Sequence, residues 1–414
     1  LHTTDGEPVE VIDPGLHNFN AGPDFFNAKV KIGGTLWVGN VEIHDKSSDW
    51  FLHGHERDPH YNNTVLHVAG RVDCVVTTAN GLQPPQVELA VPDTVRHNYE
   101  ELLRTDTYPP CYKVIPQLPR LKVRSWMSAL ETERLERKTE DIRRRARLCD
   151  GSWEGAYFVT IARNYGFGIN GDAMEQWALS VPLNDVGHHR DNAFQVEAFF
   201  MGQAGLLDTA SMPERHRQAA IDDDYFQRLQ HEYAYLAHKF QLTPIDYRLW
   251  RFLRLRPQNF PHIRIAQLVN LYCQRKTSLS LLVETGQLDD IKDMLSTQVT
   301  PYWETHYAFG CESAKSKKHL SASSINLLLI NTVVPMLFAY GRHKQDDKLC
   351  DRAFDILEQL RAEDNTIVRT WSEIGLGVEN AGDSQALIQL KKEYCDRREC
   401  LRCRFGYEYL KQKE

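Results

Sequence analysis

The densest group of chemically reactive side chains lies between positions 24 and 44 of the 414-residue chain. Asp24 precedes one strand-like segment, and Glu42 and His44 end the next. The Gly33-Gly34 pair between them predicts a β-hairpin, which folds Asp24 back toward the other two residues. Glu42 and His44 share a strand face because they are two residues apart. This set of donors could hold a divalent cation, and the alternative is an ordinary hairpin with exposed carboxylates.

Histidines are concentrated beside this hairpin. Five fall within 24 residues: His44, His53, His55, His60 and His67. On a helix, His53 and His55 would point about 200° apart and could not hold one metal together, whereas a loop would leave them freer. We expect His55 and His67 to enter the same cleft as His44 and to contact a substrate, because perturbed histidines cluster at functional sites. Solvent exposure or hydrogen bonding to buried backbone is the alternative.

Two asparagines lead into Asp24. Asn18 and Asn20 could enter the cleft and orient a phosphate group or a water molecule. Asparagine is also favoured in loops for conformational reasons alone, so a purely structural role in the turn is the alternative.

The hairpin resembles the PD-(D/E)xK phosphodiesterase superfamily, which includes many nucleases. There a Pro-Asp pair opens one strand, and an acidic residue, a spacer and a lysine close the next. The resemblance implies that Asp24 and Glu42 bind Mg²⁺ or Mn²⁺ and that His44 stands in the place of the lysine. Histidine is often neutral near physiological pH and can itself bind metal, so His44 could be a ligand or could activate water. Lys29 or Lys46 could supply the missing positive charge.

Longer strings resemble an uncharacterised family called domain of unknown function 2851. The resemblance lies in GNVEIHDKSSDWFLHGHERDPHYNNTVLHV and in the preceding VEVIDPGLHNFNAGPDF. It extends through most of the chain, including RLRPQNFPHIRIAQL and the cysteine-bearing end. It implies no activity, because none is established for that family.

Composition is that of a soluble globular protein. Hydrophobic residues make up 42% of the chain and charged residues 25%. The longest apolar run, Ile325–Tyr340, is interrupted by Asn331 and Pro335, which favours a buried helix over a membrane span. Nine cysteines, an odd number without a disulfide-like framework, and no visible signal peptide at Leu1 indicate a reducing, cytoplasmic location.

Charge is unevenly distributed. Residues 1–100 hold six Lys and Arg against fourteen Asp and Glu, although the whole chain has a net charge of only −7. An acidic segment argues against tight, non-specific binding to a nucleic-acid duplex. It fits a metal site, where carboxylates repel one another until a cation binds, and it equally fits a solvated surface. Nucleic acid stays a candidate partner, as does a protein bound through the helical domain.

The predicted fold class is α+β, with a PD-(D/E)xK-like α/β core followed by a large, irregular all-helical domain. We expect the core over residues 1–106, a Pro-rich linker over 107–123, and the helical domain over 124–414. No fixed-period repeat is visible, which weighs against a solenoid. Period-two and turn patterns predict strands at 8–13, 25–32, 36–44, 64–69, 72–78 and 86–91, with a short helix at 48–60 capped by Ser47 or Ser48.

A second group of possible ligands lies near the C-terminus. Cys395, Cys400 and Cys403 have the spacing of the first three ligands in plant-type ferredoxins, and their thiolates could bind zinc or an iron–sulfur cluster. A fourth ligand would have to come from a distance, for example from Cys311 or a histidine. Surrounding basic and aromatic residues could hold a single nucleic-acid strand. Packed thiols on a solvated helix are the alternative.

Two functions remain after other motifs are set aside. No phosphate-binding loop, GxSxG nucleophile or HExxH zinc helix occurs in the sequence. The first function is a metal-dependent phosphodiesterase or nuclease, with Asp24, Glu42 and His44 as its catalytic residues. The second is a non-catalytic binding or scaffold protein with a degenerate nuclease-like core. Metal binding at Asp24 and Glu42 distinguishes the two.

Overall fold

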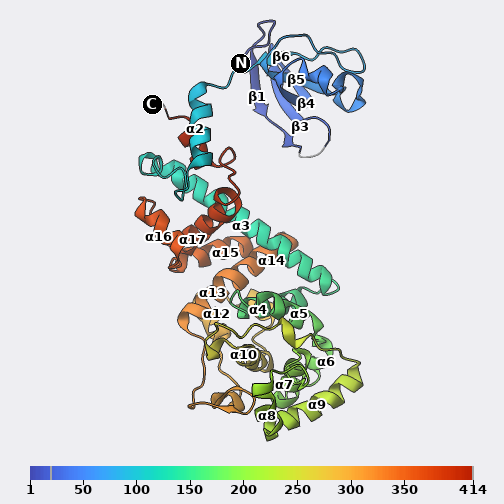
Figure 1. Cartoon of the computed structure of the whole chain (residues 1–414), viewed down its shortest axis with the longest axis vertical. Coiled ribbons are helices and arrows are strands. Elements are labelled where there is room, and N and C mark those ends of the chain that lie inside the picture. Colours follow the sequence, from blue (N-terminus) through green and yellow to red (C-terminus); the bar gives the residue numbers. More distant parts are fainter. Residues whose placement is uncertain (19–20, 413–414) are drawn as a thin grey trace. The chain divides into compact units, whose positions relative to one another are not determined.

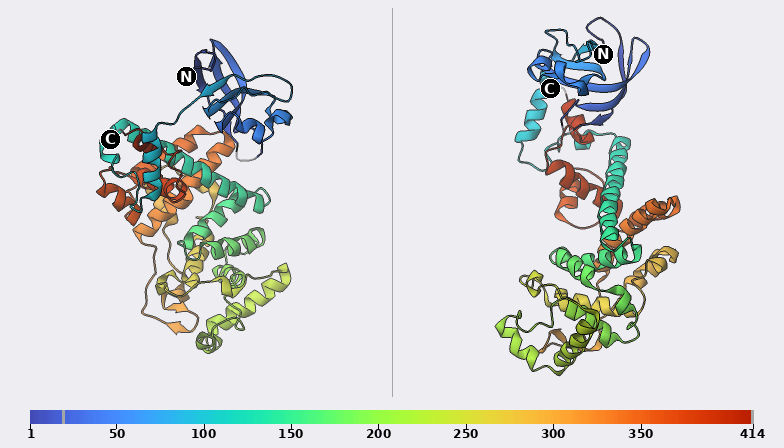
Figure 2. Two further views of the ribbon diagram at one scale, coloured as in Figure 1. Left: turned by 45° about the horizontal axis from the view of Figure 1, so that its top comes forward. Right: turned by 90° about the vertical axis from the view of Figure 1, so that its right-hand side faces the viewer.

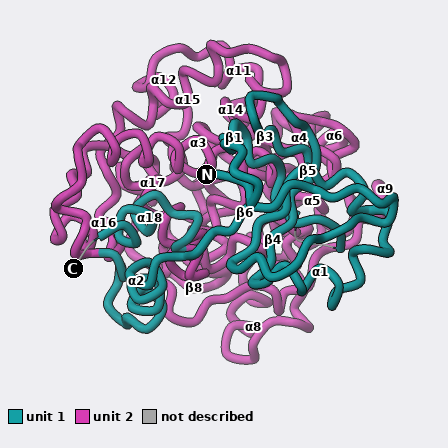
Figure 3. Tube along the Cα trace, turned by 90° about the horizontal axis from the view of Figure 1, so that it is seen from above, with its two compact units in different colours: residues 1–111, 400–414 teal, residues 112–399 magenta. Residues whose placement is uncertain are grey.

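The computed structural model, which describes residues 1–18 and 21–412, contains two compact units (Figure 3). Unit 1 comprises Leu1–Cys111 and Cys400–Glu414, and unit 2 comprises Tyr112–Glu399. The chain combines a small N-terminal mixed sheet with a large helical region, which confirms the predicted α+β class. The first boundary between the units lies within the Pro-rich segment, and the second lies between the C-terminal cysteines.

A twisted mixed sheet forms the centre of unit 1 (Figure 1). Its order is β1-β3-β4-β5-β6, with the short β2 pairing with β3. The β1–β3 and β3–β4 pairs are antiparallel, whereas the β4–β5 and β5–β6 pairs are parallel. The strands are β1 (Val9–Asp13), β2 (Leu16–His17), β3 (Phe25–Ile32), β4 (Thr35–Lys46), β5 (Thr64–Arg71) and β6 (Gln86–Glu88).

The predicted hairpin is formed by β3 and β4. Gly33 and Gly34 both have positive φ, at 56° and 88°, which a tight reversal between two strands needs and glycine adopts without steric cost. Alternation along β3 buries Ala28, Val30 and Ile32 in the sheet's apolar core. This burial fixes the register, because a slip of one residue would turn every core side chain to the other face.

The connection from β4 to its parallel neighbour β5 is compact, and only a short part of it is α-helical. It contains α1 (Asp49–Leu52) and two 3₁₀ turns, His55–Arg57 and Pro59–Tyr61. The predicted helix is therefore much shorter than 48–60. Ser48 makes no side-chain cap of this helix. The hydroxyls of Ser47 and Ser48 instead donate to the carboxylate of Asp73, at 2.9 and 3.0 Å.

The predicted strand at 72–78 is absent from the described structure. The backbone N–H groups of Asp73 and Cys74 donate to the Ser47 hydroxyl, and that of Val72 donates to Glu88 Oε2. These amides are therefore satisfied by side chains rather than by a neighbouring strand. The segment becomes a loop against the β4–β5 connection.

Two helices complete unit 1, α2 (Asp93–Arg104) and α18 (Arg404–Leu410). The buried Asn98 side chain links them by donating to backbone carbonyls of Tyr409 and Leu410, at 3.4 and 3.2 Å. The sequence patterns above did not predict α2.

Unit 2 is helical around one large apolar core. Its longest element, α3, is visible as an extended helix in the right-hand view of Figure 2. Polar side chains start several of its helices. The Asp223 carboxylate, for example, accepts a hydrogen bond from the Phe226 amide at the beginning of α9. The helices are α3 (Arg120–Leu148), α4 (Trp153–Tyr165), α5 (Gly171–Ser180), α6 (Leu183–Gly187), α7 (Ala193–Gln203), α8 (Glu214–Ile221), α9 (Asp224–Phe240), α10 (Pro261–Cys273), α11 (Leu279–Glu284), α12 (Leu288–Leu295), α13 (Ala322–Leu328), α14 (Val334–Lys344), α15 (Asp347–Gln359), α16 (Thr366–Glu373) and α17 (Ala381–Gln389).

Shorter elements connect these helices. The strands β7 (His306–Ala308) and β8 (Cys311–Glu312) form a small antiparallel pair. The 3₁₀ turns are Ile115–Gln117, Tyr247–Leu249, Pro257–Asn259 and Pro301–Glu304, and the π-helical turns are Leu329–Val333 and Leu390–Cys395.

One helical stretch, Ala322–Lys344, is long and apolar enough to cross a membrane by length and composition. It comprises α13, a π-helical turn and α14. Within its most apolar window, 61% is buried inside the structure. Leu329, Val333 and Leu337 are each fully buried in the core of unit 2. Its packing is thus that of a core helix, as the sequence predicted.

Glu131 of α3 gives unit 2 a pH-dependent stability. Burial, with the nearby carboxylates of Glu358 and Asp383, raises the pKa of Glu131 to about 7. Its Oε1 is buried without a hydrogen-bond partner. Protonated Glu131 contributes to the free energy of unfolding, and this contribution is fully present below pH 4.5. It is lost as the pH rises through about 7, which lowers the free energy of unfolding by up to roughly 3 kcal/mol.

We therefore expect Glu131→Gln to raise the midpoint of thermal unfolding at pH 8 and to change it little at pH 5. The amide is uncharged at both pH values, so it removes only the cost of ionisation. Glu136→Gln on the exposed face of the same helix is the control. An equal effect of Glu131→Gln at pH 5 and pH 8 would contradict this explanation.

Candidate metal centre

The hairpin brings Asp24 and Glu42 together through a reciprocal pair of hydrogen bonds. The Asp24 backbone N–H donates to Glu42 Oε2 at 2.9 Å, and the Ile43 N–H donates to Asp24 Oδ2 at 2.9 Å. Pairing of Phe25 with Val41 in the β3–β4 register places the residues for this exchange. Two negative side chains are therefore held at one end of the hairpin, 18 residues apart in sequence.

Both carboxylates are shielded from solvent, Asp24 only in part. Glu42 is 5% exposed, and Asp24 is half-buried. Burial, reinforced by the charge of Glu42, raises the pKa of Asp24, although the Ile43 amide and His44 act in the opposite direction. A cation between the carboxylates would relieve this repulsion and favour the ionised form.

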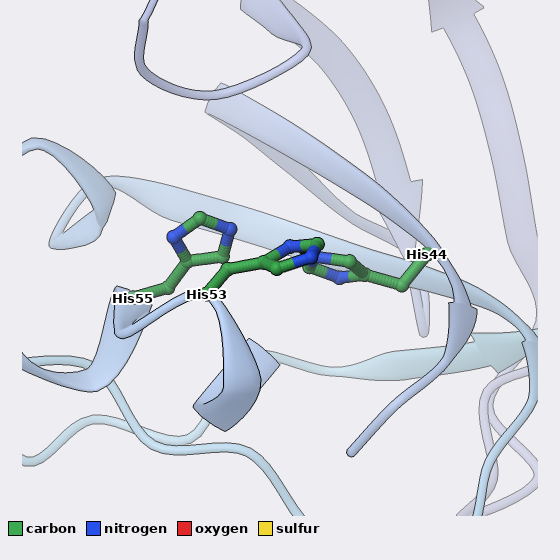
Figure 4. A group of neighbouring side chains, drawn as sticks. All are labelled: His44, His53 and His55. Atoms are coloured by element: carbon green, nitrogen blue, oxygen red, sulfur yellow. Dashed lines mark hydrogen bonds between the residues drawn. The ribbon is translucent and has the colours of Figure 1, made fainter. Parts of the chain in front are cut away.

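Three imidazoles meet beside the carboxylates: those of His44, His53 and His55 (Figure 4). One potential ligand atom from each lies within 4.8 Å of the others. Metal–ligand bonds of about 2.0–2.2 Å separate neighbouring ligand atoms by roughly 3–3.5 Å, so a small inward movement would complete a site. His53 is exposed, whereas the other two are buried, so the cluster opens to solvent on the His53 side.

Gly54 makes this convergence possible. The helix α1 ends at Leu52, and Gly54 has a φ of 77°, in the left-handed region that favours glycine. The reversal turns His55 back toward His53 instead of leaving their side chains on opposite sides of a helix. The loop geometry considered from the sequence is the one that the structure adopts.

Glu42 joins the carboxylate pair to the imidazoles. Its Oε1 lies 3.2 Å from His55 Nε2 and 3.6 Å from His44 Nε2. The contact with His55 has the distance of an ion pair but not the geometry of a hydrogen bond, because His55 Nε2 is buried without a hydrogen-bond partner. An unsatisfied ring nitrogen facing a carboxylate oxygen is well suited to share a cation with it.

Aromatic packing sets the positions of the imidazoles. The fully buried indole of Trp50 lies 5.2–6.3 Å, centroid to centroid, from the rings of His44, His55 and His67. It is anchored by a 3.0 Å hydrogen bond from Nε1 to the Thr77 carbonyl. Tyr61 stacks on His55 at 3.8 Å. The rings therefore have little freedom to turn away from one another.

Behind His44, a buried chain of hydrogen bonds continues through His67 to Gln86. His44 Nδ1 lies 2.9 Å from His67 Nε2, and His67 Nδ1 lies 3.2 Å from Gln86 Nε2. His67 is fully buried, and β5–β6 pairing places it beside Gln86. Burial lowers the pKa of His67 to about 4 and also lowers the pKa of His44. Both rings are therefore neutral near pH 7.

The orientation of the Gln86 amide assigns the protons along this chain. Its Nε2 donates to the Cys74 carbonyl at 3.2 Å, and its Oε1 accepts from the Val76 N–H at 3.4 Å. A reversed amide would set two oxygens against each other. Gln86 therefore donates to His67 Nδ1, which leaves the proton of neutral His67 on Nε2, pointing at His44.

The hydrogen bond from His67 also assigns the proton of His44. Because His44 Nδ1 accepts from His67, the proton of neutral His44 resides on Nε2. Nε2 lies 3.2 Å from His53 Nδ1, which can accept this proton in a hydrogen bond. His44 is thus arranged as a hydrogen-bond donor. Metal ligation through Nε2 would need the opposite tautomers of both His44 and His67, and would set His67 N–H against the Gln86 amide.

The remaining predicted residues lie elsewhere. Asn18 donates to the carbonyls of Ala21 and Pro23, within the loop that leads to Asp24. Asn20 lies outside the described residues. His67 belongs to the layer behind His44, while His60 bonds to Asp58 beside the cluster.

The three C-terminal cysteines are divided between the units. Cys395 ends a π-helical turn of unit 2, whereas the buried Cys400 and Cys403 belong to unit 1. The zinc or iron–sulfur site expected from their spacing stays a prediction.

The predicted site omitted His53, Gln86 and Trp50. A signal for His53 was present, since a glycine between two histidines permits the reversal that joins them. Gln86 and Trp50 act through the packing of β6 and α1 against the cluster, which depends on sheet order. No local pattern in the sequence carries that information.

We expect nitrogen NMR of the imidazoles to find the proton on Nε2 in both His44 and His67. At pH 8, Gln86→Glu replaces the donor with an acceptor and should reverse the tautomer of His67, because its Nδ1 must then donate. Gln83→Glu, an exposed residue with the same charge change, is the control. Unchanged tautomers in folded Gln86→Glu would show that Gln86 does not assign them.

Comparison with known proteins places the chain in a family. A family model described as "Protein of unknown function (DUF2851)" matches residues 1–366, which include the whole sheet and the cluster of histidines. The match ends before the C-terminal cysteines, which the resemblance in sequence had been expected to include. No curated protein and no solved structure matches the chain. The chain belongs to the DUF2851 family.

Proposed function

We propose that unit 1 is a metal-dependent phosphodiesterase that acts on nucleic acid. The observation that carries this proposal is the convergence of Asp24, Glu42, His53 and His55 beside a hydrogen-bond donor, His44. The antiparallel β1-β3-β4 strands, followed by a crossover to the parallel strand β5, are compatible with the α/β core that the PD-(D/E)xK resemblance implies. That agreement concerns the fold, and the chemistry rests on the side chains.

The cation in this proposal is held by Glu42, His53 and His55, with Asp24 beside them. A site with two imidazole nitrogens favours Mn²⁺ or another transition metal over Mg²⁺, which prefers oxygen ligands. A bound cation would lower the pKa of a coordinated water and offset developing negative charge on the phosphate. Binding at His53 Nδ1 would displace the His44 N–H, which can then point to Glu42 or to a substrate oxygen.

His44 takes the position of the superfamily's lysine but supplies a different chemistry. A neutral imidazole with its proton on Nε2 donates a hydrogen bond without adding a permanent charge. It can stabilise a phosphate oxygen or give its proton to the leaving alkoxide. His67 and Gln86 act as positioning residues, since they lie behind His44 and act on it through the buried hydrogen bonds from Gln86 through His67. We therefore favour proton donation over metal ligation for His44.

The alternative function is a binding or scaffold protein with an inactive nuclease-like core. It is favoured by the excess of acidic residues in positions 1–100 and by the absence of the family-typical lysine at position 44. Repulsion between such a surface and polyanionic nucleic acid would weaken binding unless cations intervene.

We expect wild-type protein with Mn²⁺ to cleave single- or double-stranded DNA or RNA in a gel assay. Asp24→Asn should abolish cleavage, because the amide cannot balance the cation's charge. Asp45→Asn, an exposed residue on the next position of β4 after His44, should retain activity. Circular dichroism would establish that both variants fold.

Cleavage that persists in folded Asp24→Asn would remove this mechanism. Absence of cleavage by wild type on every substrate, with Mn²⁺ bound, would favour the scaffold function.

A further inference from the structure

The helix α3 of unit 2 carries two cationic side chains that have no part in the proposed phosphodiesterase. Its buried face includes Met127, Arg134, Ile142 and Arg145, at the helical spacing that places side chains on one side. Lys138 lies in the middle of this series. The helix packs against α14 and α17 of the same unit (Figure 1). Positive charge is therefore present on a face that a helix usually fills with apolar groups.

Arg145 shows how this protein satisfies a buried cation. It is 5% exposed, and its Nε and Nη2 lie 3.2 and 3.1 Å from Glu175 Oε2. A further hydrogen bond of 3.4 Å joins its Nη1 to the Thr160 hydroxyl. Buried arginines usually have such partners, because the removal of a charge from water is costly unless another group compensates for it.

Arg134 and Lys138 have no such partners. Arg134 is 8% exposed, and Lys138 is partly buried one helical turn further on. Within residues 1–18 and 21–412, neither side chain forms a hydrogen bond, an ion pair or a cation–π contact. Two neighbouring positive charges are thus removed from much of the solvent without a compensating group.

The electrostatics confirm that these charges are poorly compensated. Burial, followed by the charge of Arg137, lowers the pKa of Arg134 to about 10. Burial, together with the charges of Arg134 and Arg137, lowers the pKa of Lys138 to about 8. Glu363 and Asp141 oppose the two shifts, but neither carboxylate forms an ion pair with the side chain on which it acts. Glu363 instead accepts a hydrogen bond from the Gln385 amide.

Solvent reaches both cationic groups. Some unpartnered nitrogens in the described part of unit 2, such as Arg352 Nε, are sealed from solvent, but none of those in Arg134 or Lys138 belongs to that group. Both groups therefore keep some accessible surface. The low exposure of Arg134 restricts contact with both groups to a small solute.

The chemistry of the pair indicates the kind of solute. Residues four apart on a helix have Cβ atoms about 5–6 Å from each other, so one small anion can contact both side chains. A guanidinium presents a planar fork of N–H donors, and an ammonium adds donors of its own. Neither group is an acceptor. A tetrahedral oxyanion has enough oxygens to accept from both at once, and phosphate matches the guanidinium fork.

We propose that Arg134 and Lys138 form a binding site for a phosphate group within unit 2. The guanidinium of Arg134 binds two phosphate oxygens, and the ammonium of Lys138 binds a third. The anion supplies the negative charge that the surrounding carboxylates do not. Because access is narrow, free inorganic phosphate should bind more tightly than a bulkier phosphate monoester. The site does not depend on the metal centre of unit 1.

Calorimetric titration of inorganic phosphate into the full chain tests the site directly, in chloride buffer at constant ionic strength. We expect saturable binding that weakens tenfold or more in Arg134→Gln and in Lys138→Gln, because charge-assisted hydrogen bonds are lost. Arg147→Gln makes the same change of charge at an exposed position of α3 and should bind as wild type does. Adenosine monophosphate is the monoester probe. Its tighter binding at the same two residues would identify a phosphorylated metabolite, rather than free phosphate, as the ligand of this site.

Thermal unfolding separates loss of the site from loss of the fold. In phosphate-free buffer, Arg134→Met and Lys138→Met should unfold no earlier than wild type, because each removes an uncompensated charge and keeps an apolar stem. Phosphate should raise the midpoint of wild type by a few degrees and leave both variants unchanged. The proposal would be overturned if wild type bound neither probe, or if phosphate stabilised the variants as much as wild type. A lower midpoint of both variants without phosphate would also overturn it, since the protein itself would then satisfy the two cations.

Discussion

A buried imidazole nitrogen without a hydrogen-bond partner costs free energy, and the satisfaction of both nitrogens of the fully buried His67 orders the centre of unit 1. Gln86 supplies one partner and His44 the other, so β4, β5 and β6 must keep a single register. An unsatisfied group there would cost about 1–3 kcal/mol. The same bonds assign the proton of His44 to Nε2. The hydrogen bonds of the buried core thus determine which nitrogen of His44 carries the proton that faces the proposed cation site.

The carboxylates present the opposite situation, in which the protein alone does not satisfy its charges. Asp24 and Glu42 are held together by backbone amides, while burial raises the pKa of Asp24. His55 Nε2 faces Glu42 without a hydrogen bond. The inner residues, His67 and Gln86, have hydrogen-bond partners, whereas the outer carboxylates and His55 lack some of theirs. This is the arrangement expected of a site in which a cation completes the outer group. Because His53 is exposed, these outer residues are accessible from solvent.

Sequence reasoning succeeded where local chemistry decides structure and failed where sheet order does. The Gly33-Gly34 turn and the alternation of β3 were sufficient to predict the hairpin and its paired ends. The loop at 72–78 has strand-like residues, but hydrogen bonds to Ser47 override their propensity. Gln86 could not be placed beside His67 without knowing that β5 and β6 pair in parallel. The proton on His44 depends on that pairing.

Calorimetric titration of Mn²⁺ into metal-stripped protein tests the central claim, a cation held by Glu42, His53 and His55. Wild type and His60→Gln, whose substituted residue lies outside the cluster, should bind one equivalent, and more tightly than they bind Mg²⁺. His53→Gln/His55→Gln should lose this binding while keeping the fold, since neither ring takes part in the buried hydrogen bonds that run from His44 through His67 to Gln86. Undiminished Mn²⁺ binding in the double variant, or none in wild type, would contradict the assignment of this site.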